Sequence, residues 1–419
     1  MIVRITLLLL VVMCARGQNP ETNRYLAIAR KALSEKDYAA AYEALTSAHA
    51  FHPYHQAILY NLGVTSAATG RLDESVGYLR KALHVNASYK LDLPELGPLK
   101  DRKDFKALLT LQQQLQQPVT HSDTAAVITN RRLHVESVTV DPVTGTIYVG
   151  SVHQRKIVAI DKKGVARDFT PSGYEGMTAV LGVRIDPSSK FLWACSSPME
   201  EMEGYDSLTP SRVYKFDLKS GKLVARYDPP AKTGHVFGDL VIGPNGQVLV
   251  SDSKTNEIYT VNESSHTLDR FFVDTDFWNI QGISFTDDGK YLFISDYIKG
   301  PYRLELATRK LIRLSTQVEN SLKGIDGLLY YKGSLFAMQN GTSPLRVMQF
   351  TLNRTMDTLI KAEIIDQGIP VLNEPTQGTV AGNYFYYVAN SQWGGYTDQH
   401  VLKPDSELQD IVIMKFKVK

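Results

Sequence analysis

The chain has 419 residues, of which 43% are hydrophobic and 21% are charged, and its 46 basic residues nearly balance 44 acidic ones. This length exceeds one ordinary domain, and the composition is that of a soluble globular protein. A net charge of +2 gives no excess of basic residues that would attract nucleic acid or an anionic membrane surface.

The N-terminal segment has the pattern of a secretory signal peptide, residues 1–17. A basic start at Met1–Arg4 precedes an apolar run at Ile5–Met13, and small residues then lead to a cleavage point before Gln18. The run is too short to span a bilayer, so we expect an exported protein, periplasmic or extracellular, without a membrane span. Lipid anchoring at Cys14 is the less favoured alternative, because Met13 stands where such a site needs a small residue.

Removal of this segment leaves one cysteine, Cys195, and a net charge close to zero. A single thiol forms no internal disulfide. Cys195 lies in the apolar run FLWACSS, which favours a buried small hydrophobic residue over a nucleophile.

Residues 20–117 predict a small helical domain, because strand patterns are nearly missing and two segments match each other at a period of 34 residues. The matching large and small positions are Tyr25, Ile28, Ala29, Tyr38, Ala41, Leu45, Ala48 and Pro53 in the first segment, and Leu59, Leu62, Gly63, Gly70, Leu79 and Ala82 in the second. The pattern resembles a tetratricopeptide-repeat pair. A third helical stretch at Leu93–Leu109 would cap it. The resemblance implies a protein or peptide partner, and packing against the rest of the chain is the alternative.

Residues 121–419 contain six copies of a strand, a turn and a second strand. The copies read VESVTVDPVTGTIYVGS, GVRIDPSSKFLWACSS, GDLVIGPNGQVLVSDS, QGISFTDDGKYLFISDY, IDGLLYYKGSLFAMQNG and TQGTVAGNYFYYVANSQ, and they start roughly 43 to 56 residues apart. With further strands after each copy, this spacing predicts a six-bladed β-propeller. The final strand IVIMKFKV either completes the last blade or pairs with an early strand of the first blade.

Polar residues at the start of each first strand are the main candidates for a site. The first strand of a propeller blade lines the central channel, so these side chains should converge on the axis. They are Glu136, Asp239, Gln281, Asp326 and Gln377. Carboxylates directed at one axis repel each other unless protons or a cation neutralise them.

Four of the copies resemble, in order and spacing, blades of the SMP-30/gluconolactonase family. HVESVTVDP resembles the first blade of that family, and the Asn-Asp, Asn-Gly and Asp-Gly blades correspond to FGDLVIGPNG, QGISFTDDG and IDGLLYYKG. In that family a divalent cation, often calcium, lies at the channel mouth. The resemblance implies Glu136, Gln281 and Asp326 as its ligands. Gln281 departs from the family by one extra methylene, and Gly238 replaces an asparagine that contacts substrate.

The resemblance implies a metal-dependent hydrolase of a lactone or small ester, with Asp239 and Asp326 as the catalytic carboxylates. A bound cation could polarise the carbonyl of the substrate. The alternative is that these side chains only hydrogen-bond neighbouring blades around a water-filled channel, in a protein that binds a ligand or another protein without catalysis. The small-molecule ligand would lie in the channel in either case.

Other residues are weaker candidates. His134, His153, His235 and His400 lie near strand ends, where surface or hydrogen-bonded roles are the commoner outcome. Asp252, Asp296, Asn340 and Asn390 recur after the second strands, which favours a role in turns over one as ligands. Residues 198–211 (the insert) and 392–407 (the rim loop) are long for blade loops, and Trp393, Tyr396 and His400 could face a ligand there.

Overall fold

The structure is a computed structural model, and it describes residues 20–53, 55–231 and 234–418. The predicted signal peptide and Cys14 lie outside the described residues. The chain divides into two compact units, one formed by residues up to Leu79 together with Leu91–Phe105, the other by Arg80–Lys90 and Lys106–Lys419. None of the helices in the described part is long and apolar enough to cross a membrane.

The first unit is helical. Its elements are α1 (Pro20–Ser34), α2 (Tyr38–Phe51), α3 (Gln56–Ala68), the first part of α4 (Leu72–Val85), the 3₁₀ helix η1 (Pro94–Leu99) and the start of α5 (Lys103–Gln116). Ala29, Ala44 and Ala48 are buried with Leu45 in one apolar cluster. Gly63 lies where α3 meets α4, because a Cβ there would lie 2.6 Å from Cγ of Leu79. Small residues therefore let the helices approach closely, as the repeat pattern predicts.

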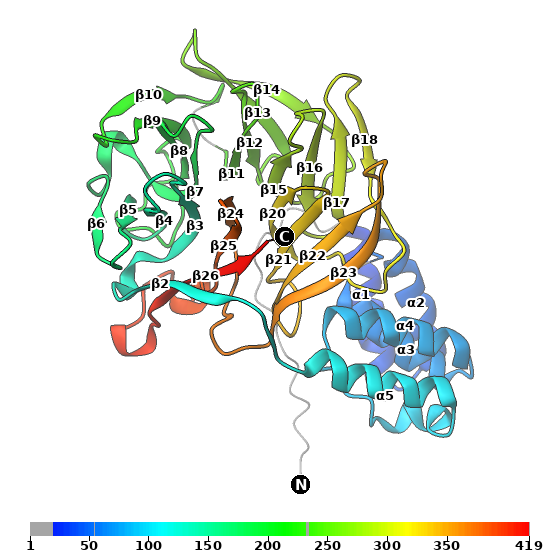
Figure 1. Cartoon of the computed structure of the whole chain (residues 1–419). Coiled ribbons are helices and arrows are strands. Elements are labelled where there is room, and N and C mark those ends of the chain that lie inside the picture. The colour runs from blue at the N-terminus through cyan, green and yellow to red at the C-terminus, as the bar shows by residue number, and fades with distance from the viewer. Residues whose placement is uncertain (1–19, 54, 232–233, 419) are drawn as a thin grey trace. The chain divides into compact units, whose positions relative to one another are not determined.

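In the second unit the described residues form six sheets, and five of them are built on four consecutive antiparallel strands (Figure 1). Blade 1 contains β3 (Val135–Val140), β4 (Ile147–Ser151), β5 (Lys156–Ile160) and β6 (Ala166–Asp168); blade 2 contains β7 (Ala179–Ile185), β8 (Phe191–Ser197), β9 (Arg212–Asp217) and β10 (Leu223–Tyr227); blade 3 contains β11 (Phe237–Ile242), β12 (Val248–Asp252), β13 (Glu257–Asn262) and β14 (Thr267–Val273). Blade 4 contains β15 (Ile280–Phe285), β16 (Tyr291–Asp296), β17 (Gly300–Glu305) and β18 (Lys310–Arg313); blade 5 contains β20 (Ile325–Tyr331), β21 (Ser334–Gln339), β22 (Arg346–Leu352) and β23 (Thr358–Gln367), with β1 (Val119–Thr120) and β19 (Ser315–Thr316) added to β23.

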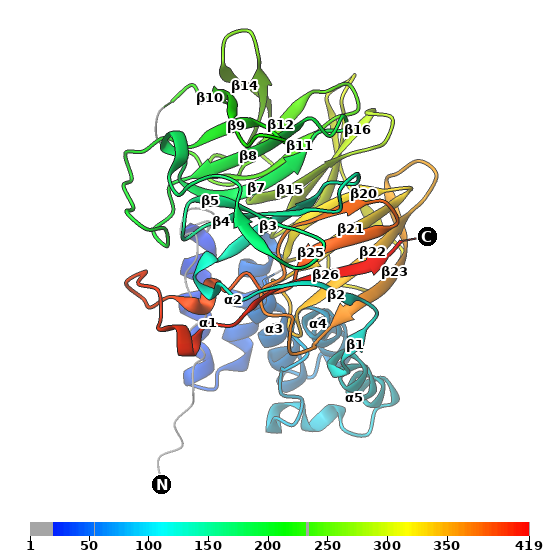
Figure 2. The same cartoon turned by 60° about the vertical axis from the view of Figure 1, so that its left-hand side comes forward.

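Blade 6 shows which of the two expected pairings the final strand makes. It contains β24 (Gly378–Ala381), β25 (Tyr384–Val388), β26 (Ile411–Lys417) and, as its outermost strand, β2 (Asp123–Ile128). The last strand of the chain thus completes the last blade, and residues from before the first blade close it, with Ile128 opposite Ile411 (Figure 2).

The core lies between the blades. Each inner strand packs against the next one around the ring, and β24 packs against β3. An apolar cluster fills the space between every neighbouring pair of blades. Alternating apolar positions on both faces of each sheet supply these clusters. The six-bladed propeller with a helical N-terminal region, mainly β overall, is therefore confirmed.

Candidate functional site

Five of the six inner strands begin with an irregular pairing to the second strand of their blade. These register shifts lie between Val135 and Ser137, Val180 and Gly182, Phe237 and Asp239, Ile280 and Ile283, and Ile325 and Leu328. A β-bulge leaves a residue unpaired and redirects its side chain. Glu136, Gln281 and Asp326 are such residues, so the local backbone that exposes them to the channel recurs from blade to blade.

Glycines after these residues allow the inner strands to crowd around the axis. A Cβ on Gly282 would lie 2.4 Å from the backbone nitrogen of Leu328, and one on Gly327 would lie 2.2 Å from the carbonyl oxygen of Thr376. In each of the two pairs, Gln281-Gly282 and Asp326-Gly327, the two residues therefore have different roles. The first residue faces the channel, and the glycine lets the next blade approach.

The Glu136 carboxylate is buried, with 7% of the residue exposed. Its Oε2 accepts hydrogen bonds from the Ser391 hydroxyl at 2.5 Å and from the Trp393 indole N–H at 2.9 Å. Both donors come from the segment that follows β25 in blade 6. These two bonds fix the orientation of the carboxylate.

Asp326 is held in a similar way from blades 4 and 5. Its Oδ2 accepts a hydrogen bond from the Asn340 amide at 2.6 Å, and the Asn340 oxygen accepts one from the Tyr297 hydroxyl at 2.9 Å. Asn340 therefore orients a candidate site residue, which goes beyond the turn role expected for it.

Glu374 is a third carboxylate of this group, and sequence reasoning missed it. It lies just before β24, and its Oε2 accepts a hydrogen bond from the Gly394 backbone N–H at 3.2 Å. Gly394 is the chain neighbour of Trp393, which bonds Glu136, so one short segment connects Glu374 and Glu136. The charge of Glu374 raises the pKa of both Glu136 and Asp326. The only sequence signal was its position two residues before the sixth copy of the repeat.

Burial and mutual repulsion disfavour charge on these side chains. Burial, followed by repulsion from Asp326, raises the pKa of Glu136 well above its ordinary value. The pKa of Asp326 is raised to about 6, first by burial and then by the charges of Asp239 and Glu374, against the stabilising Asn340 bond. Burial also raises the pKa of Glu374. We call Glu136, Gln281, Asp326 and Glu374 the mouth cluster.

The two departures from the SMP-30 pattern lie beside each other. The amide nitrogen of Gln281 donates to Asn279 Oδ1 at 2.6 Å, so its oxygen is directed elsewhere. That oxygen lies 3.7 Å from the position a Cβ would take on Gly238. The longer glutamine thus occupies space next to the residue that lacks a side chain, and it brings an amide oxygen there.

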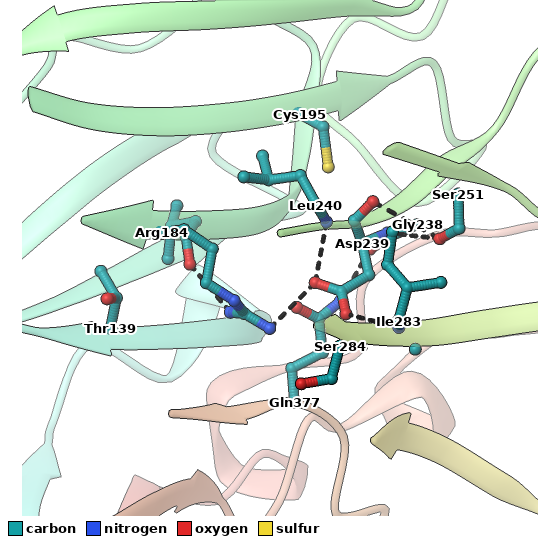
Figure 3. A network of polar contacts seen from close by, with 12 residues as sticks. Thr139, Arg184, Cys195, Gly238, Asp239, Leu240, Ser251, Ile283, Ser284 and Gln377 are labelled. Carbon is teal, nitrogen blue, oxygen red and sulfur yellow. Dashed lines mark hydrogen bonds and ion pairs between the residues drawn. The ribbon is translucent and has the colours of Figure 1, made fainter. Parts of the chain in front are cut away.

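Asp239 has a different environment from the mouth cluster. Arg184 Nη2 donates to its Oδ1 at 2.9 Å, and the backbone N–H groups of Leu240 and Ile283 donate to its two oxygens (Figure 3). Arg184 and Asp239 form a buried ion pair, with side chains 11% and 2% exposed. The sequence prediction did not include Arg184. Asp239 as a catalytic group stays a prediction, and its carboxylate is already neutralised by a partner.

Gln377 crosses the channel beside this ion pair. Its amide nitrogen donates to the carbonyl oxygens of Leu181 at 3.0 Å and Gly238 at 2.7 Å, so blade 6 is bonded to blades 2 and 3. The residue is 4% exposed. Gln377 therefore links blades across the axis, which is the alternative role weighed for the channel residues.

The mouth cluster supplies oxygen donors for a cation. Among the residues that the structure describes, no three His, Cys, Asp or Glu side chains lie close enough together to hold a metal ion. The predicted ligands are two carboxylates and an amide, all oxygen donors of the kind that calcium prefers. Burial and the neighbouring carboxylates raise the pKa of Glu136 and Asp326, and a bound cation would oppose that rise. The donor chemistry fits a hard divalent cation.

The remaining candidates are hydrogen-bonded side chains. His235 contacts Asp252 Oδ2 at 2.6 Å, and Asp252 and Asp296 accept bonds from backbone N–H groups of neighbouring loops. Asn390 bonds the backbone of Asp410 and Val412. Cys195 is buried, and burial raises the pKa of its thiol, which disfavours a nucleophile.

The insert and the rim loop contact each other. His400 in the rim loop lies between two carboxylates of the insert, 2.6 Å from Glu200 Oε2 and 2.7 Å from Glu201 Oε1. The Tyr396 hydroxyl is 2.8 Å from His134 Nδ1. Residues 198–211 and 392–407 thus contact each other, and Trp393 of the second segment reaches Glu136.

Fold and site together define a six-bladed propeller whose inner strands carry the buried or part-buried carboxylates Glu136, Asp239 and Asp326. The tetratricopeptide-repeat family model matches residues 32–90. A search of the curated proteins gave no match. The solved structures with a similar fold include a gluconolactonase from Xanthomonas campestris, with 14% identity, 72% of this chain and 89% of that chain covered and a TM-score of 0.47.

Two further solved structures resemble the chain. The calcium-binding protein regucalcin from Agrobacterium tumefaciens has 15% identity and a TM-score of 0.48, with 72% of this chain and 96% of that chain covered. A PQQ-bound aldose sugar dehydrogenase from Streptomyces coelicolor has 14% identity and a TM-score of 0.47, with 72% and 99% covered. At this level the likeness concerns the fold, and function has to be argued from the residues of the site.

Proposed function

We propose that the propeller is a divalent-cation-dependent hydrolase of a lactone or small ester, with calcium the leading candidate. The mouth cluster carries the proposal, because Glu136 is a buried and Asp326 a part-buried carboxylate, both with raised pKa values and hydrogen-bonded orientations. When bound, a cation would supply charge compensation and polarise a carbonyl oxygen. Glu136, Gln281 and Asp326 would hold it.

The chain's own side chains suggest how the reaction proceeds. We infer that Asp326, whose pKa burial raises to about 6 in the cation-free site, accepts a proton from a nucleophilic water. The Asn340 bond keeps one of its oxygens in place, while Ser391 and Trp393 hold the Glu136 carboxylate. Removal of negative charge from the cluster should therefore impair both ion binding and turnover.

The experiment compares metal uptake and turnover in matched variants. Wild type should take up one divalent ion per chain by elemental analysis and gain thermal stability on calcium addition. Asp326→Asn and Glu136→Gln should lose both effects and lactone hydrolysis. Asp287→Asn, at an exposed turn, should behave as wild type. A wild-type protein that takes up no ion and melts at one temperature with or without calcium contradicts the hydrolase proposal.

A non-enzymatic binding protein is the second candidate, and one observation favours it. Asp239, one of the two predicted catalytic carboxylates, is neutralised by Arg184. In this case the channel would hold a small molecule and the tetratricopeptide repeats would hold a protein or peptide. Tight ligand binding without turnover in the presence of calcium would support this candidate.

We also propose that the protein is exported, on the strength of the N-terminal sequence. N-terminal sequencing of the mature protein should then give Gln18 as the first residue. A full-length protein retained in the cytoplasm would contradict export, and incorporation of labelled fatty acid lost in Cys14→Ser would identify the lipid-anchored alternative.

A further inference from the structure

Trp393 lies where the rim loop, the insert and the mouth cluster meet. Its ring packs edge-on to His134, with 4.4 Å between ring centroids. It also packs against the apolar cluster that includes Met199 and Met202 of the insert. Its indole N–H reaches the Glu136 carboxylate at 2.9 Å. One side chain thus joins two rim segments to a candidate cation ligand.

The indole N–H of Trp393 donates to one particular oxygen of Glu136. Trp393 and Ser391 both donate to Oε2, and they lie two residues apart on the same segment. A carboxylate that receives two charge-assisted hydrogen bonds on one oxygen has little freedom to rotate. Its other oxygen, Oε1, is thereby held at a defined place in the mouth.

The segment that carries Trp393 is itself tied down. The side-chain amide of Gln392 makes two bonds to the backbone of Gln409, at 2.8 and 2.9 Å. Gly394 donates its backbone N–H to Glu374, another member of the mouth cluster. The position of the indole is therefore set by the loop and by a second carboxylate of the site.

We propose that Trp393 is a positioning residue for the cation site, which orients Glu136 from the rim loop. The proposal rests on the proposed function, since it assigns a role toward the cation. The geometry has a direct spectroscopic consequence. An ion held by Glu136 lies next to the indole, so a terbium ion bound in place of calcium should emit when tryptophan is excited.

The chain offers matched variants for this measurement, since it contains three tryptophans. Trp193→Phe/Trp278→Phe keeps only Trp393 and should retain the sensitised terbium emission. Trp393→Phe keeps the ring volume in part but removes the N–H donor. It should lose the emission and bind calcium about tenfold or more weakly, as expected for loss of a hydrogen bond to a charged group. Trp193→Phe, at a core position, should bind calcium as wild type does.

Several outcomes overturn the proposal. Calcium affinity of Trp393→Phe within twofold of wild type would do so, as would terbium binding without emission in the variant that keeps only Trp393. Either result leaves the cation site itself intact. A wild-type protein that binds neither ion refutes the proposed function and this inference together. Should Trp393→Phe fail to fold, the variant that keeps Trp393 still decides the point.

Discussion

Arg184→Met should destabilise the propeller strongly at pH 8 and much less at pH 4.5. The change removes the partner of a carboxylate that is 1% exposed, and it leaves Asp239 with only the backbone donors Leu240 and Ile283. Breaking a buried ion pair on one side costs about 3–5 kcal/mol, because the remaining charge is uncompensated. This is a large fraction of the stability of an ordinary domain.

The pH dependence follows from the carboxyl that remains. Burial already raises the pKa of Asp239, and Arg184 opposes that rise. Without Arg184 the folded-state pKa rises further above the unfolded value of about 3.9, so the folded state binds the proton more tightly. Stability is then retained below the unfolded pKa and is lost as the pH rises to the new folded pKa, by about 1.4 kcal/mol per unit.

Denaturant midpoints at pH 4.5 and 8 measure this effect in wild type, Arg184→Met, Asp239→Asn and the double variant. Asp239→Asn should be destabilised at both pH values and not more strongly at pH 8, because the Arg184 charge that it leaves unpaired does not titrate, and the wild-type carboxyl itself stabilises the fold less as the pH rises. The double variant should be more stable than the sum of the single losses predicts. A loss below about 1 kcal/mol at pH 8 in Arg184→Met, or one that does not shrink at pH 4.5, would refute the reasoning.

Three further predictions follow from other features. In the metal-free protein, folded Asp326 has a pKa of about 6, so the free energy of unfolding should fall by about 3 kcal/mol as the pH rises from about 4 to 6. Asp326→Asn should therefore flatten the pH profile of the melting temperature. Gly327→Ala should lower the free energy of unfolding by about 1–3 kcal/mol, because its Cβ would overlap the Thr376 carbonyl oxygen. Gly394→Ala should not lower it, because a Cβ at Gly394 would meet open space. Equal denaturant midpoints for the two variants would contradict this reasoning. Glu201 and Glu200 raise the pKa of His400, so its contacts with the insert should be strongest below the unfolded value of about 6.5 and weaken as the pH rises through the raised one. Hydrogen exchange of the rim loop should be slower at pH 6 than at pH 8.5 after correction for intrinsic rates, and His400→Gln should abolish the difference.

The blades were predictable because their determinants are local. Alternating apolar residues and turn sequences recur in every blade, and Gln281 and Asp326, each followed by glycine, fall on bulges for the same local reason. The repeat period of 34 residues likewise predicted that Gly63 lies where two helices cross. These features depend on neighbours a few residues away in sequence.

The partners of the site residues were not predictable, since they come from distant segments. Ser391 and Trp393 reach Glu136 across about 255 residues, and Arg184 reaches Asp239 from the preceding blade. Glu374 precedes a strand in a loop that carries no repeat pattern. The relation between Gln281 and Gly238 appears only when two blades stand side by side. Sequence periodicity predicts the blades. The hydrogen-bond partners that the loops supply can be identified only once the ring is closed.

Closure of blade 6 by β2 also has a kinetic meaning. Thr124 pairs with Met414, so the outermost strand of that blade is made nearly 300 residues before the strand that it joins. Pairing over such a separation is slow, because most of the chain must be ordered before the contact forms. Until then the free edge of β26 is open to other chains. Overexpression should therefore yield aggregates that decrease when synthesis is slowed. A chain that begins after Ile128, and so lacks β2, should refold only if a peptide with the sequence of β2 is added.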